Sequence, residues 1–388
     1  MSSQQHDGSP AEVKMEVTYR PQKKVFDFRS DTVTRPTPEM LASIFQAEFG
    51  DEVRGEDPTV KLLQDKVAEM TGKEAALYVC SGNMSNQLAI RTHVTNNYSK
   101  EVALQEIIYR QVSHPDVHEL MDHQVYVYEL GGIAFFSQSQ VKPLNPNHFN
   151  EKHLTADIIE KNLNTKNDLH HPLSTIISLE NTLNGSIFPH EELQKIRGVA
   201  DKYGLVMHLD GARLWNASAA TGLSLKELTQ HFDSVSLCLS KGLGAPVGSV
   251  LVGSRKFIER AKQYRKLFGG GWRQAGVVAA CGLWSIENVF PKMNDDHTNA
   301  LLLHEGLLKL GFEAVKPDTN MIFIDSTKLG HSFESILKAA EPFQKEVPVL
   351  MEVNTTYGAR LVVHHQIGRD GVEAALQLLS SAIQSLGQ

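Results

Sequence analysis

Two stretches decide the fold: LVMHLDGAR at residues 205–213 and SVSLCLSKGLGAPVGS at residues 234–249. In each, a short apolar run ends at a polar or reactive side chain, Asp210 in the first and Lys241 in the second. Short apolar runs that alternate with amphipathic stretches are typical of a doubly wound α/β domain. Ligands of such domains bind at the carboxyl ends of the strands. We therefore expect Asp210 and Lys241 at one edge of a mostly parallel sheet.

The same alternation extends over most of the chain. Further buried strands are expected at residues 74–80, 174–179 and 249–252, and amphipathic helices at residues 83–94 and 190–203. No solenoid-length repeat or long low-complexity tract interrupts this pattern. The fold class is therefore α/β.

The pattern changes near residue 286, where helical stretches flank the apolar runs MIFID (321–325) and RLVVH (360–364). The first 25 residues are polar, carry acidic side chains and lack the apolar stretch of a targeting signal. The sequence thus predicts a disordered tail over 1–25, a large domain over 26–285 and a small α+β domain over 286–388.

The amino-acid composition argues against several classes of binding partner. The 388 residues include 38 Lys and Arg against 45 Asp and Glu, a formal net charge of −7, which argues against a nucleic-acid or anionic-membrane binder. No apolar run reaches the roughly 18–20 residues of a membrane span. Three scattered cysteines form neither a disulfide framework nor a CxxC metal site, so we expect small buried side chains, a reducing cytoplasmic location and no metal.

The chemistry of Asp210 and Lys241 suits pyridoxal phosphate (PLP). This cofactor needs a lysine that holds it as a Schiff base, a carboxylate beside its pyridine nitrogen and a cradle for its phosphate. Lys241 precedes a glycine-rich turn that a bulky cofactor could approach, and Asp210 ends an apolar strand. Ser81-Gly82-Asn83 lies at the start of the helix expected over 83–94, whose free N–H groups and dipole favour an anion.

Each of these residues also has an ordinary interpretation. Lys241 could be an exposed surface lysine, and Asp210 could be a helix N-cap. The basic loop that ends at Arg273 could wrap a phosphate, cross a subunit interface or be a flexible surface loop. Ser30, in Arg29-Ser30-Asp31, and Arg360 belong to two clusters that could bind an amino-acid carboxylate, although an ordinary salt bridge would explain either cluster.

The ordered set resembles the low-specificity L-threonine aldolases, particularly the fungal ones, from about residue 27 to residue 380. This family has the aspartate-aminotransferase-like fold of PLP enzymes, known as fold type I. The stretches that carry the resemblance are DFRSDTVTRPT (27–37), GEDPTV (55–60), SGNMSNQLAI (81–90), ELGGIAFFSQ (129–138), LENTLNGSIFP (179–189), LDGARLWNA (209–217), SKGLGAPVGS (240–249), GGGWRQAG (269–276) and DTNMIFI (318–324).

The resemblance implies a role for each candidate residue. Lys241 would be the Schiff-base lysine, and Asp210 would pair with the pyridine nitrogen. Arg213 would lie near the ring oxygen of the cofactor and the substrate carboxylate. Ser30 and Arg360 would also bind the substrate carboxylate, and Gly82 and Asn83 would hold the phosphate. The family is usually homotetrameric, with active sites at the subunit interfaces, so Arg273 would reach the phosphate from a neighbouring subunit.

Three departures from the family pattern stand out. The histidine that stacks on the cofactor lies five residues before the glutamate that matches Glu129, where this chain has Gln124. His123 is the nearest substitute, and the preceding stretch 101–120 looks like an insertion or a replacement. Arg54 stands where an aromatic residue is common. Leu183 stands where bacterial relatives often have histidine, which should weaken discrimination between threonine and allo-threonine.

The leading prediction is an aldolase that splits L-threonine or L-allo-threonine into glycine and acetaldehyde. One alternative keeps the cofactor and changes the reaction, to another lyase or a transaminase of the same fold. A second is a catalytically impaired PLP-binding paralogue, because of the altered 100–125 region. A Rossmann dehydrogenase is set aside, because no GxGxxG follows the first strand–helix turn.

Overall fold

The computed structural model describes residues 22–94, 106–110, 128–144, 153–166 and 170–387. Within these ranges the central sheet has seven strands in the order β2-β8-β7-β6-β5-β3-β4. Strand β8 runs antiparallel to both of its neighbours, and the other pairs are parallel. The bounds are β2 (Ala75–Val79), β3 (Glu106–Arg110), β4 (Gln140–Leu144), β5 (Ser174–Glu180), β6 (Val206–Asp210), β7 (Ser234–Cys238) and β8 (Ser249–Gly253). The predicted mostly parallel α/β sheet is confirmed.

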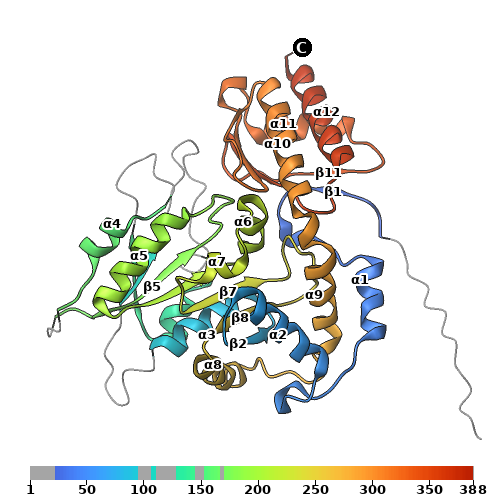
Figure 1. Ribbon diagram of the computed structural model, residues 1–388. Coiled ribbons are helices and arrows are strands. Elements are labelled where there is room, and N and C mark those ends of the chain that lie inside the picture. Colours follow the sequence, from blue (N-terminus) through green and yellow to red (C-terminus); the bar gives the residue numbers. More distant parts are fainter. Residues whose placement is uncertain (1–21, 95–105, 111–127, 145–152, 167–169, 388) are drawn as a thin grey trace, which may run out of the picture.

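Helices cover both faces of this sheet (Figure 1). On one face, α2 (Pro58–Thr71), α5 (His190–Tyr203) and α7 (Leu225–Thr229) enclose the largest hydrophobic core. On the other face lie α3 (Gly82–Val94) and α8 (Arg255–Leu267). Side chains alternate along a strand, so β6 sends Met207 and Leu209 into the larger core and turns His208 and Asp210 toward α3.

The C-terminal part contains an antiparallel sheet in the order β12-β10-β9 and a second core. Strand β1, at residues 26–27, pairs with β11, at residues 349–350, so Phe26 and Phe28 pack in this second core. The first residues of the predicted large domain therefore contact the C-terminal part, and the division at residue 286 stays a prediction. The bounds here are β9 (Glu313–Ala314), β10 (Met321–Asp325), β12 (Gly358–Val362), α11 (Phe333–Ala340) and α12 (Arg369–Leu386).

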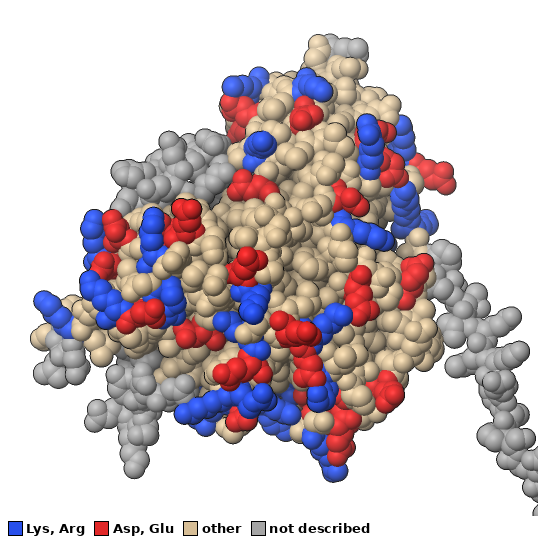
Figure 2. All heavy atoms as spheres, viewed as in Figure 1, with Lys and Arg blue, Asp and Glu red and all other residues tan. Residues whose placement is uncertain are grey.

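Helix α10 (Met293–Lys309) joins the two cores, since Met293 belongs to the first and Leu303 to the second. No helix among the described residues is both long and apolar enough to span a bilayer. Lys and Arg side chains are interspersed with Asp and Glu on the face shown in Figure 2. The remaining helices are α1 (Pro38–Ala42), α4 (Ala156–Asn162), α6 (Leu214–Thr221) and α9 (Gly276–Asn288).

Within the unusual 101–120 stretch, Glu106–Arg110 forms β3, an interior strand that pairs with β5 and β4. The expectation that all three cysteines are buried needs correction. Cys238 and Cys281 are buried as expected, but Cys80 is exposed, because it follows the last residue of β2 at the point where the chain turns into α3.

Candidate active site

A cavity of about 350 Å³ lies beside the ends of β6 and β7. Four predicted site residues line it, namely Ser30, Arg213, Lys241 and Arg360. They come from four segments of the chain: the turn after β1, the N-terminus of α6, the loop after β7, and β12. The fold thus brings together residues that lie more than 300 positions apart in sequence (30 to 360).

Lys241 is held by its backbone in the loop after β7. Its carbonyl oxygen accepts hydrogen bonds from Gly244 N–H, at 2.8 Å, and from the Thr34 hydroxyl, at 3.1 Å. Gly244 has a φ of +76°, and a Cβ there would lie 2.3 Å from the ring of His365. The glycine therefore permits a turn that directs the half-buried lysine side chain into the cavity.

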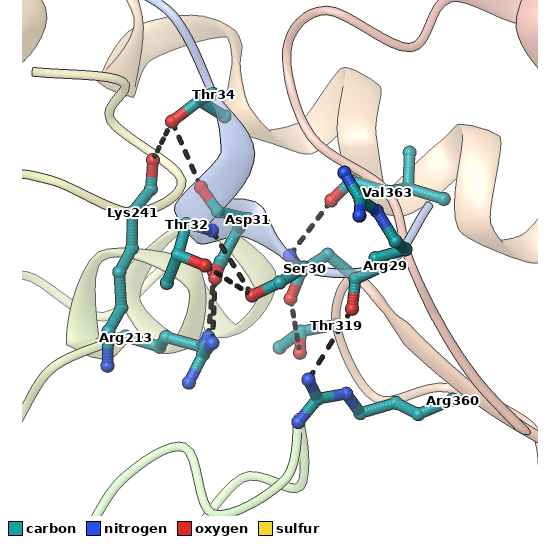
Figure 3. Close-up of polar contacts among 11 residues, drawn as sticks. Arg29, Ser30, Asp31, Thr32, Thr34, Arg213, Lys241, Thr319, Arg360 and Val363 are labelled. Carbon is teal, nitrogen blue, oxygen red and sulfur yellow. Dashed lines mark hydrogen bonds and ion pairs between the residues drawn. The ribbon is translucent and has the colours of Figure 1, made fainter. Parts of the chain in front are cut away.

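Arg213 is fixed by Asp31 (Figure 3). Its Nε and Nη2 atoms donate to the two carboxylate oxygens at 2.7 Å each, and both side chains are buried. Burial alone would raise the pKa of Asp31, but the charges of Arg213 and then Lys241 outweigh burial and lower it. Asp31 thus remains an anion that orients Arg213 at the cavity wall.

Arg360 brings a second guanidinium group to the cavity. Its Nη2 atom lies 3.5 Å from the carbonyl oxygen of Arg29, and its buried Nε atom has no hydrogen-bond partner among the described residues. Burial, and then the nearby charge of Arg213, lower the pKa of Arg360. An anion that accepted from both guanidinium groups would relieve this repulsion, as a substrate carboxylate would.

The Arg29-Ser30-Asp31 cluster, which was predicted to bind a carboxylate, contributes only Ser30 to the cavity lining. Ser30 lines the cavity, and its hydroxyl oxygen accepts from the N–H and the hydroxyl of Thr32. Arg29 instead pairs with Asp27 through two hydrogen bonds of 2.8 and 2.7 Å. The structure therefore separates Arg29 from Ser30, although they are neighbours in sequence.

Asp210 is the last residue of β6 and is buried. Its Oδ1 atom accepts from Ala212 N–H at 3.0 Å, and its Oδ2 atom accepts from the Asn86 amide at 2.8 Å. Each carboxylate oxygen can accept more than one hydrogen bond, so Asp210 can still receive a donor such as a protonated pyridine nitrogen.

Asp210, Gly82, Asn83 and Arg273 do not line this cavity. Gly82 and Asn83 lie in the first turn of α3, where backbone N–H groups have no acceptor within the helix. Arg273 is exposed and donates to Asp51 at 2.7 Å. His123 and Gln124 lie outside the described residues, and their predicted relation to the cofactor stays a prediction.

Sequence reasoning assigned no role to several polar residues around this site. Asn86 and Gln87 are buried on α3, and both donate to the carboxyl group of Glu129. Burial, and then the charge of Asp210, raise the pKa of Glu129 to about 8, despite the hydrogen bond from Gln87. Consecutive polar residues in a helix that covers a sheet were the available signal. The cavity also takes its lining from Thr32, Tyr128, Glu180, Leu183, Asn184, Phe323, Glu352 and Asn354.

These features fit pyridoxal phosphate. A lysine amine and two guanidinium groups face one cavity, and the buried carboxylate of Asp210 is the cross-strand neighbour of Glu180, which lines that cavity. Among the described residues, no three His, Cys, Asp or Glu side chains are grouped to hold a metal ion. The sheet order, with an aspartate at the end of β6 and a lysine after β7, defines the class: PLP-dependent enzymes of fold type I.

Comparisons with known proteins agree with this class. A family model described as beta-eliminating lyase matches residues 27–328. The chain is 40% identical over 367 residues to the "Probable low-specificity L-threonine aldolase" of Schizosaccharomyces pombe, covering 94% of this chain and 89% of the relative. It is 38% identical to the low specificity L-threonine aldolase of Escherichia coli K12, covering 89% and 96%. The fold is shared with Leishmania major threonine aldolase, with a TM-score of 0.74, 17% identity and coverage of 92% and 99%.

The chain therefore belongs to the low-specificity L-threonine aldolase family, within the beta-eliminating lyases. It is a carbon–carbon lyase of a PLP-dependent family.

Proposed function

We propose that this enzyme uses pyridoxal phosphate to cleave L-threonine and L-allo-threonine into glycine and acetaldehyde. The observation that supports this most directly is the placement of Lys241 and the guanidinium groups of Arg213 and Arg360 around one cavity. A lysine amine suits a covalently held aldehyde cofactor, and paired guanidinium groups suit an amino-acid carboxylate.

Each residue has a separate part in this proposal. Lys241 would hold the cofactor through Nζ, Asp210 would accept from its pyridine nitrogen, and the N–H groups of Gly82 and Asn83 would receive its phosphate. When bound, the cofactor supplies an electron-poor ring that stabilises the charge left on Cα. Ser30, Arg213 and Arg360 would grip the substrate carboxylate, which fixes the direction of the Cα–Cβ bond.

The reaction conserves atoms and charge. The Cα–Cβ bond breaks, the β-hydroxyl loses its proton as acetaldehyde forms, and a proton returns to Cα to give glycine. Because the two guanidinium groups would bind the carboxylate on Cα and make no demand on the substituents of Cβ, the chain can position substrates that differ at Cβ. His123 stays a prediction for the group that stacks on the cofactor.

We also propose that the enzyme is a cytoplasmic homotetramer in which Arg273 reaches the phosphate of a neighbouring subunit. Arg273 is exposed and does not line the cavity of its own subunit, which supports a role in a neighbouring one. Mass measurement in solution tests the assembly, and a monomer that retains full activity would contradict it.

The decisive experiment incubates the purified protein with pyridoxal phosphate and either diastereomer, and measures glycine and acetaldehyde. We expect both products in equal amounts, and none from Lys241→Ala. A yellow, folded protein that gives neither product would instead favour the PLP-binding paralogue. Loss of threonine without acetaldehyde would favour another lyase or a transaminase.

A further inference from the structure

A continuous line of buried polar side chains connects α3 with Asp210. His93 Nε2 lies 2.7 Å from the Ser234 hydroxyl, which lies 2.8 Å from His208 Nδ1. His208 Nε2 lies 3.2 Å from Asn86 Oδ1, and Asn86 Nδ2 lies 2.8 Å from Asp210 Oδ2. The line occupies the face of the sheet that α3 covers, because alternation along β6 turns His208 and Asp210 to the same side.

The direction of these hydrogen bonds follows from the carboxylate end. An ionised carboxylate only accepts, so Asn86 must turn its NH2 group toward Asp210 and its carbonyl oxygen toward His208. That oxygen also only accepts, so His208 must carry a proton on Nε2. Burial lowers the pKa of His208 to about 4, which leaves the ring neutral near pH 7 and makes Nδ1 an acceptor.

The remaining two bonds are then determined as well. Ser234 must donate its hydroxyl proton to His208 Nδ1, and its oxygen is free to accept from His93. Burial lowers the pKa of His93 to about 3, and its ring stacks on Phe257 with centroids 4.4 Å apart. A neutral His93 therefore donates from Nε2, and every donor in the line points toward Asp210.

Asn86 is the branch point of this network. Its second amide hydrogen is directed to Glu129 Oε1 at 3.1 Å, while Gln87 donates to Glu129 Oε2 at 2.6 Å. The Asn86 side chain thus bonds two carboxyl groups and one histidine, and reversing its amide would turn an oxygen toward both carboxyl groups. In a buried site, such a reversal removes the hydrogen bonds that join Asn86 to Asp210 and His208, and it places the amide oxygen against the Asp210 carboxylate.

We propose that Asn86 is a positioning residue for Asp210, and that the donor line from His93 through Ser234 and His208 keeps its amide turned toward that carboxylate. The proposal rests on the proposed role of Asp210 beside the cofactor. Without the Ser234 hydroxyl, His208 can carry its proton on Nδ1 and present a lone pair to Asn86. The amide of Asn86 would then reverse and repel Asp210, weakening its grip on the pyridine nitrogen.

The proton position on His208 tests the direction of the line without any substrate. Long-range proton–nitrogen spectra of 15N-histidine-labelled protein, with His208 assigned by comparison with His208→Gln, should show Nε2 protonated and Nδ1 bare. A proton on Nδ1, or a charged ring at pH 7, would overturn the proposal. This measurement remains decisive even if the activity variants fold poorly.

Ser234→Ala tests the consequence for catalysis. We expect kcat for L-threonine to fall by about five- to tenfold with KM within about twofold, because the line acts on the cofactor side of the site. Ser285→Ala is the matched control, since Ser285 is also fully buried, and its hydroxyl donates to the Cys281 carbonyl of its own helix at 2.8 Å and lies 3.9 Å from the sulfur of Met40, away from Asp210. Ser234→Thr keeps the hydroxyl and should recover most of kcat.

Equal kcat values for Ser234→Ala and Ser285→Ala would overturn the proposal, as would a change confined to KM. Failure of the proposed function is recognised separately. In that case the unmodified enzyme gives no acetaldehyde, whereas the histidine spectra still report the direction of the donor line.

Discussion

A methyl group on Gly82 would lie 2.7 Å from Sγ of Cys238, the last residue of β7. Cys238 is itself buried and accepts a hydrogen bond from the Ser249 hydroxyl at 3.2 Å, which restrains its sulfur. The absence of a side chain at Gly82 thus lets the first turn of α3 approach the strand that precedes Lys241. This contact therefore packs the residues predicted to bind the phosphate against the strand that leads to Lys241.

Gly82→Ala should lower the free energy of unfolding by about 1–3 kcal/mol, the usual effect of overpacking, and weaken cofactor binding. Denaturant unfolding and titration with pyridoxal phosphate measure the two effects. Gly82→Ala combined with Cys238→Ala removes the sulfur and should restore part of both. Gly198→Ala, in α5 with nothing within 4 Å of the added Cβ, is the control and should be neutral or slightly stabilising. Equal behaviour of the two single variants would refute the contact.

Asp31→Asn should be strongly destabilising. It leaves the buried Arg213 guanidinium without an anionic partner, which typically costs about 3–5 kcal/mol. Urea unfolding measures the loss. Glu373→Gln breaks the exposed Arg369–Glu373 pair instead and should change stability by less than about 1 kcal/mol. A loss for Asp31→Asn as small as that of the control would show that Asp31 does not hold Arg213.

Arg360→Lys should raise KM for L-threonine by roughly tenfold or more, with a smaller change in kcat, because lysine cannot reproduce the planar fork that grips a carboxylate. Steady-state kinetics separate the two constants. Arg29→Lys alters the neighbouring arginine, which pairs with Asp27 outside the cavity, and should leave KM nearly unchanged. If Arg29→Lys had the larger effect on KM, the carboxylate site would be misassigned.

Glu129→Gln should reduce the pH dependence of stability. The pKa of Glu129 is raised from 4.5 to about 8, so the folded state retains a proton that the unfolded state releases. Its contribution is therefore fully present below about pH 4.5 and is lost as pH rises through about 8. One such proton changes the slope by up to about 1.4 kcal/mol per pH unit. Unfolding measured from pH 5 to 8 should show a flatter profile for the variant, and an unchanged slope would contradict the shift.

Leu183 should permit both diastereomers of the substrate. It lines the cavity as a buried apolar residue and offers the β-hydroxyl no polar partner. We expect kcat/KM values for L-threonine and L-allo-threonine within about fivefold of each other, and a larger difference in Leu183→His. A strong preference in the unmodified enzyme would place the selective contact elsewhere in the cavity.

Much of the framework could be predicted from local sequence. The apolar runs before Asp210 and Lys241 predict two strands, and parallel strands end at the same edge of a sheet, so the residue pattern alone places the two side chains near one site. Helix α5 begins and ends at the residues expected from its periodicity, His190 and Tyr203. Such features depend on neighbours a few positions apart, which a single sequence displays directly.

Only the tertiary structure decided which distant side chains meet. Arg213 bonds Asp31 from 182 positions away, and the adjacent Arg29 turns to Asp27 instead. The same holds for the amide direction of Asn86, which depends on its contacts with Asp210 and His208 of β6 and with Glu129. A residue pattern indicates which face of a helix or strand is buried. It does not indicate which other element covers that face. The covering element depends on the path of the whole chain and on the hydrogen bonds that buried polar groups require.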